Sequence, residues 1–195
     1  MRRKILQKSN KNKGKLAIPL LIVALMVLSV LAYTVGTPST DQSTTYAGHK
    51  FTVNQNEQLW ETDINGQNYK FRFLPGDLNF DVEGDIDAPA YYLVEDPNAN
   101  YSERDLSLIS LAKFEMKESL SSFGKTVRLG FLTEYNGQSQ IDCSNTSLNF
   151  PVLLFELSNY TQVTNQNDCI HISGPSGVEV VQAKDKFLYS ILGID

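Results

Sequence analysis

The chain has 195 residues, of which 42% are hydrophobic and 20% are charged, and its formal net charge is −5. This length suits one domain with an ordinary core plus short accessory segments. Seven of the 17 basic residues lie in the first 15 positions, which leaves ten basic against all 22 acidic residues in the remainder, a formal charge of −12. An acidic domain lacks the basic stripe that phosphate backbones require, which excludes nucleic acid as the partner.

Residues 1–15 are predicted to be a basic cytoplasmic tail and residues 16–35 a transmembrane helix. The run from Leu16 to Val35 contains 20 residues and no charge, and a helix of that length crosses the roughly 30 Å hydrocarbon core. Basic residues before a span keep that end in the cytoplasm. We therefore expect a single-pass signal anchor in the cell membrane, with the C-terminal domain extracytoplasmic.

Two alternatives to a retained anchor stay open. A cleaved signal peptide would use a site after Ala32, although the apolar run exceeds the about 7–15 residues typical of such signals. Prepilin-type processing would cut after Gly14, which would leave Lys15 at the start of the apolar helix.

Residues 36–46 read GTPSTDQSTTY and are predicted to be a flexible linker, because they are rich in Ser and Thr and lack large aliphatic side chains. The extracytoplasmic domain is predicted to comprise residues 47–195. Asn65-Gly66 between two alternating segments predicts a β-hairpin, and residues 49–54 predict a third strand before it. Residues 90–96 begin with an apolar run that is typical of a strand buried on both faces.

Two helices are predicted in this domain. Ser102 with Asp105 opens the first, which continues to about Ser122, and Ser176 with Glu179 opens the second, which ends at Leu192. Further strands are predicted at residues 126–134, 151–157 and 169–173. The order predicts an α+β fold: a mixed, mostly antiparallel sheet with two helices packed on it, preceded by the transmembrane helix.

The two cysteines, Cys143 and Cys169, both lie in the predicted extracytoplasmic part. In an oxidising compartment they are expected to form a structural disulfide bond. A redox-active pair or two metal thiolates is the alternative, although the spacing matches no thiol motif.

Residues 77–87, DLNFDVEGDID, partly match a calcium-binding loop. Its candidate metal ligands are Asn79, Asp81, Glu83, Asp85 and Asp87. Gly84 falls where the loop turns, but Ala90 occupies the position at which a bidentate Glu belongs. The alternative is a half-buried strand, in which Leu78, Phe80 and Val82 face the core. No cofactor other than this calcium ion is expected.

The chain contains two histidines, His49 and His171, and no HExxH or GxSxG motif. Alternation places His171 on the face of its strand opposite Ile170, together with Ser173. A groove site there is one interpretation, and a surface or half-buried strand position is the alternative. No catalytic residue is assigned.

Three Asn-x-Ser/Thr sequons are candidate N-glycosylation sites and would make the protein a glycoprotein: Asn100, Asn145 and Asn159.

The basic tail and single span, together with the segments FTVNQNEQLWETDINGQNYKFRFLP and KDKFLYSILGID, resemble small membrane-anchored surface proteins of archaea that have no assigned activity. The resemblance implies an archaeal cell surface as the location. It implies no catalytic or ligand-binding residue.

Three function classes are compatible with these features. The favoured one is an interaction or structural surface module whose partners are the lipid bilayer and other envelope proteins. Exposed aromatic side chains would serve such a surface. The candidates are Tyr91, Tyr92, Tyr135 and Tyr160, of which half or more are expected to lie in the core. The alternatives are an extracellular hydrolase, which needs a cleft with a perturbed acid or histidine, and a calcium-binding module.

Overall fold

The structure is a computed structural model that describes residues 22–28, 42–137 and 140–194. These residues belong to two units, 1–41 and 42–195, each of which is described by itself. In the first unit, residues 22–28 form a helical segment, whereas the basic tail, most of the predicted span and residues 36–41 of the predicted linker lie outside the described residues. Within the described residues, none of the helices has the length and apolarity needed to cross a membrane.

The second unit begins with a four-stranded antiparallel sheet in the order β1-β2-β3-β4. Its strands are β1 (Ser43–Tyr46), β2 (His49–Asn54), β3 (Leu59–Ile64) and β4 (Gln67–Phe71). The predicted Asn65-Gly66 hairpin is confirmed, since both residues have positive φ and Ile64 pairs with Gln67. Residues 43–46, which the prediction places in the linker, pair with β2 as strand β1.

A second sheet has six strands in the order β5-β9-β10-β8-β6-β7. The bounds are β5 (Val82–Glu83), β6 (Ala90–Glu95), β7 (Thr126–Phe131), β8 (Val152–Leu157), β9 (Gln162–Gln166) and β10 (Cys169–Gly174). Strands β10, β8, β6 and β7 run parallel, and β9 is antiparallel to β10. The α+β class is therefore confirmed, but the strands form two sheets rather than one, and the larger sheet is mainly parallel because helix α2 returns the chain between β6 and β7.

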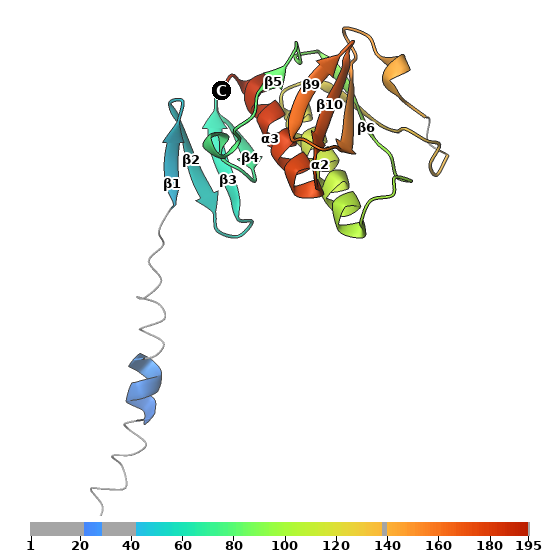
Figure 1. Ribbon diagram of the computed structural model, residues 1–195. Helices are drawn as coiled ribbons and strands as arrows, with labels where there is room; N and C mark the ends of the chain where they lie inside the picture. Colours follow the sequence, from blue (N-terminus) through green and yellow to red (C-terminus); the bar gives the residue numbers. More distant parts are fainter. Residues whose placement is uncertain (1–21, 29–41, 138–139, 195) are drawn as a thin grey trace, which may run out of the picture. The chain divides into compact units, whose positions relative to one another are not determined.

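Helices α2 (Glu103–Ser122) and α3 (Gly177–Leu192) lie between the two sheets (Figure 1). Both predicted N-caps are confirmed: Ser102 accepts the Asp105 N–H and Ser176 accepts the Val178 N–H. One apolar core joins the helices to both sheets. The Tyr189 ring of α3 stacks on Phe71 of β4 with centroids 4.1 Å apart, which fastens the smaller sheet to the helices. Short 3₁₀ turns occur at Pro75–Asp77 and Cys143–Asn145.

Candidate functional site

The five candidate calcium ligands are all exposed, as in the strand interpretation of residues 77–87. Glu83 lies in β5 beside Thr164 of β9. The Asp87 carboxylate contacts the Lys125 ammonium, with 2.5 Å between Oδ1 and Nζ, and Asp85 accepts the Asp87 N–H. Among the described residues, these acids form no group of three or more whose oxygens lie close together. The strand interpretation is favoured here, and calcium binding stays an untested alternative from the sequence.

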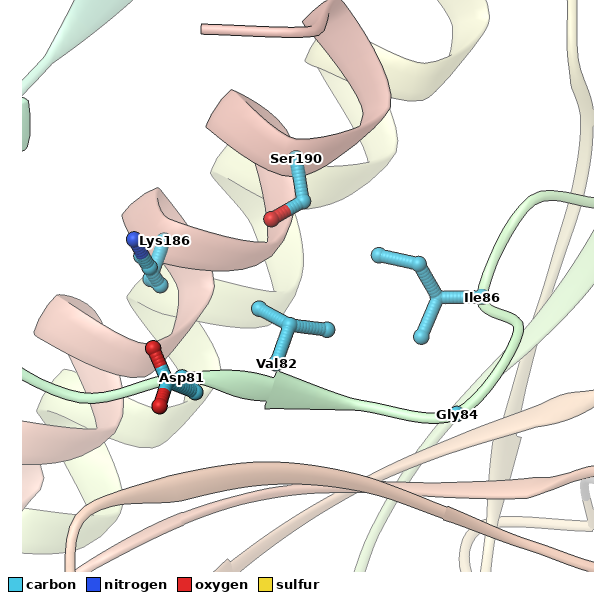
Figure 2. Close-up of a pocket in the computed structure, with 6 residues that line it drawn as sticks. All are labelled: Asp81, Val82, Gly84, Ile86, Lys186 and Ser190. Atoms are coloured by element: carbon cyan, nitrogen blue, oxygen red, sulfur yellow. The ribbon is translucent and has the colours of Figure 1, made fainter. Parts of the chain in front are cut away.

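Asp81 lines a pocket of about 410 Å³ between the β5 segment and α3. Figure 2 shows Lys186 and Ser190 projecting from α3 toward Asp81 and Val82 of that segment. The pocket therefore combines one acid, one base and one hydroxyl with the apolar side chains of Val82 and Ile86. This lining suits a small polar ligand, but it contains neither histidine nor cysteine.

The outer face of the six-stranded sheet, the face turned away from the helices, carries a histidine–carboxylate pair. Nδ1 of His171 on β10 lies 2.7 Å from Oε1 of Glu156 on β8, and the two side chains are 22% and 33% exposed. Because Ile170 and Ile172 are fully buried, the predicted orientation of His171 is confirmed. The second histidine, His49, begins β2 in the other sheet.

A hydroxyl pair lies near the end of the same face. Ser173 follows His171 by two residues, and its hydroxyl is hydrogen-bonded to Ser158 at 3.2 Å. Ser173 itself is fully buried. In contrast, Ser176 caps α3 and interacts with Glu179. The His171–Glu156 pair can hold or transfer a proton, but within the described residues no hydroxyl is hydrogen-bonded to His171.

The predicted disulfide between Cys143 and Cys169 is present. Cys169 is buried in β10, whereas Cys143 lies in the more exposed segment that crosses the outer face. Thr146 adds a hydrogen bond to the Asn167 carbonyl. A bond across 26 residues contributes about 3.5 kcal/mol in the chain-entropy model. The sulfur atoms and a ring nitrogen of His171 all lie within 4.8 Å of one another, so His171 is a neighbour of both the disulfide and Glu156.

Two buried ion pairs were not expected from the sequence. Lys113 of α2 contacts Glu95 at 2.6 Å. Lys184 of α3 contacts both Asp185 and Glu115, at 2.5 and 2.9 Å. The burial of Lys113 could have been inferred from its spacing, since it follows the buried Ile109 by four residues and so lies on the stripe of α2 that packs on the sheet. These pairs stabilise the packing of the helices, and Glu115 also lines a small pocket of about 140 Å³ together with Phe71 and Phe114.

Strand β7 forms an edge of the six-stranded sheet. Within the described residues, β7 pairs with β6 along its whole length, and on its other side only Phe131 is engaged, by Gln140 and Ile141. From Thr126 to Leu129, no other described strand pairs with this outer edge of β7. The Leu129 side chain is 45% exposed. Edges of this kind are where added strands bind.

Of the four candidate surface tyrosines, two are exposed and two are at least partly buried, which agrees with the expectation that half or more lie in the core. Tyr160 and Tyr135 are exposed, whereas Tyr91 is fully buried and donates its hydroxyl to the Ile86 carbonyl. Tyr92 is partly buried and packs on Phe150. The three candidate glycosylation residues are exposed, and their glycosylation stays a prediction: Asn100, Asn145 and Asn159.

A search for relatives found no family model, no curated protein and no solved structure that matches this chain.

Proposed function

We propose that this protein is a single-pass membrane protein whose extracytoplasmic domain binds a partner protein of the envelope by strand addition to β7. The open β7 edge is the observation that carries the proposal. The anchor at residues 16–35 and the outward orientation rest on the charge pattern of the sequence, and the archaeal cell surface rests on the resemblance.

The backbone of β7 presents alternate residues outward. Thr126 and Leu132 donate their N–H groups inward, to Pro89 and Glu95. The backbone N–H and C=O groups of the odd-numbered residues therefore point away from β6. The Phe131 carbonyl shows this direction, since it accepts the Ile141 N–H. Val127 and Leu129 thus offer N–H and C=O groups to an added strand. The opposite edge strand, β5, has only two residues, which is a usual protection against such pairing.

Side chains at the edge indicate the chemistry of the partner. Leu129 faces the helix side of the sheet and is partly exposed. Arg128 faces the outer side, where its guanidinium lies 5.3 Å from the Phe150 ring centroid, and it has no carboxylate partner in the part of the chain that the structure describes. The occupant is therefore an extended segment with an apolar residue opposite Leu129 and an acidic residue opposite Arg128.

A short peptide of alternating valine and glutamate tests this proposal with the full chain. Binding is expected to slow amide hydrogen exchange at Val127 and Leu129 and to leave Arg128 and Gly130, which already bond to β6, unchanged. Leu129→Pro removes the outward N–H and is expected to abolish binding, whereas Leu129→Thr keeps that N–H and is expected to retain most of it. Protection spread evenly over the sheet, or equal binding by both variants, would contradict strand addition.

The location is tested separately. Protease added to intact cells is expected to digest the domain and leave the residues 1–35 segment in the membrane. Resistance of the domain in intact cells, with digestion after lysis, would contradict the orientation without bearing on β7.

A further inference from the structure

The disulfide, His171 and Glu156 form one continuous group on the outer face of the six-stranded sheet, and none of them contributes to the β7 edge. Cys169 and His171 lie two residues apart on β10 and share a face. Cys143 reaches this face from the crossing segment, with its Cα 5.3 Å from that of Cys169. We propose that reduction of this disulfide creates a zinc site whose ligands are Cys143, Cys169 and His171, and whose imidazole is positioned by Glu156.

The spacing of the ligand atoms fits a tetrahedral zinc ion. Bonds of about 2.3 Å to sulfur and 2.0–2.1 Å to nitrogen place the ligand atoms of one ion about 3.3–3.8 Å from one another. The two sulfur atoms and a His171 ring nitrogen already lie within 4.8 Å of one another. Once the S–S bond is broken, the sulfurs need to separate by only about 2 Å to reach that distance, since thiolates on one zinc ion are not bonded to each other.

The two sides of the site are held by different kinds of structure. Cys169 and His171 are held in a strand with partners on both sides, β8 and β9. Cys143 lies in a short 3₁₀ turn that Asp142 and Asn145 cap. The turn can therefore move away as one piece while the strand keeps its two ligands in place.

Glu156 supplies the second contact that zinc-bound histidines use. Its Oε1 lies 2.7 Å from His171 Nδ1, and a carboxylate on one ring nitrogen keeps the proton there. The Nε2 lone pair is then free to bind metal. Glu156 is thus a positioning residue, and a fourth zinc position is left to water, as in sites with three protein ligands.

Reduction of the disulfide and binding of zinc are two successive steps. A dithiol reductant, either the active site of a thiol–disulfide oxidoreductase or dithiothreitol, transfers two electrons and two protons to the Cys143–Cys169 bond and is itself oxidised to a disulfide. Zinc then displaces one proton from each thiol and binds the two thiolates. In the reverse exchange, the disulfide of an oxidoreductase accepts two electrons from the two thiolates and takes up two protons from solvent, which releases the zinc ion and restores the S–S bond, so disulfide and metal exclude each other.

The test uses the full chain in detergent, under argon, oxidised or reduced with dithiothreitol that is then removed. Cobalt(II) is added as the spectroscopic probe, followed by zinc in competition with a chromophoric chelator. The reduced protein is expected to bind one ion with a thiolate-to-cobalt charge-transfer band, and the oxidised protein none. His171→Ala is expected to weaken zinc binding by at least about tenfold, and Glu156→Gln by about 10–100-fold.

His49→Ala is the matched control and is expected to bind zinc like the unmodified chain, since His49 lies in the other sheet. Far-UV circular dichroism of the reduced protein, recorded with and without zinc, measures whether the reduced chain is folded and whether zinc restores its fold. Equal binding by oxidised and reduced protein, or full affinity in His171→Ala, would overturn the proposal. So would a reduced chain that unfolds and does not refold with zinc.

Discussion

Lys184 and Asp185, consecutive residues of α3, are both buried and form an ion pair with 2.5 Å between Nζ and Oδ1. Asp185 also accepts the backbone N–H groups of Arg72 and Phe73, just after β4. The pair therefore joins the smaller sheet to the helix layer. Burial lowers the pKa of Lys184, but Asp185 and Glu115 raise it by more, so the ammonium stays charged.

Asp185→Ala is expected to lower the free energy of unfolding by about 3–5 kcal/mol, because it removes one of the two carboxylates that contact the buried Lys184 ammonium and the acceptor of two backbone N–H groups. Urea titration of the full chain measures this change. The double variant Lys184→Met/Asp185→Asn removes both charges and keeps an acceptor oxygen, so it is expected to be more stable than Asp185→Ala. A loss as small as that of Glu118→Gln, an exposed control, would contradict this account.

Glu115 is expected to make the stability depend on acid pH. Burial raises the pKa of its carboxyl, but Lys184 and Arg72 lower it by more, and the result lies below the ordinary value. A carboxyl with a lowered folded-state pKa contributes stability above its unfolded pKa of about 4.3 and loses it as the pH falls through the folded-state pKa.

Glu115→Gln is therefore expected to cost about 1–3 kcal/mol at neutral pH and progressively less below about pH 4. Urea titrations at a series of pH values measure the difference. A cost that stays constant down to about pH 3 would show that charge at Glu115 does not contribute.

Gly177 is expected to tolerate no side chain. It begins α3, its N–H is donated to Asp105 of α2, and a Cβ there would lie 2.7 Å from Leu108 Cβ. Gly177→Ala should therefore lower the free energy of unfolding by about 1–3 kcal/mol, the usual cost of overpacking. Gly76→Ala is the control, because its Cβ would meet only the Tyr46 ring at an ordinary 3.6 Å, and thermal unfolding should separate the two variants clearly.

Neither calcium nor a calcium chelator is expected to change the midpoint of thermal unfolding of the chain by more than about 1 °C. The reason is that Asp87 is neutralised by Lys125 and Glu83 is part of β5. A rise of several degrees with calcium that is abolished by Asp81→Asn would instead establish residues 77–87 as a metal-binding loop.

Local signals predicted most of the secondary structure, because each acts within a few residues. The Asn65-Gly66 turn, the Ser102 and Ser176 caps and the alternation around His171 all have this character. Strand β9 was not predicted, since Gln162–Gln166 is largely polar. Its place in the sheet depends on pairing with β10.

The candidate sites could be predicted only in part. Both cysteines were identified as a pair from the sequence, and the orientation of His171 followed from alternation. Glu156 was not linked to His171, because residues 15 positions apart become neighbours only through the pairing of β8 with β10. The open edge of β7 likewise depends on its position at the end of the strand order.

The helices, the hairpin and the oxidised cysteine pair follow from the amino-acid sequence alone, because their causes are local geometry and chemistry. In contrast, the burial of α3 on both sides follows from tertiary packing. The sequence predicts one apolar stripe with Val180 and Phe187, yet Lys184 and Asp185 are also buried, because the smaller sheet packs on the side that the stripe leaves polar. Burial of that side depends on residues over 100 positions earlier in the chain, which no local pattern in α3 encodes.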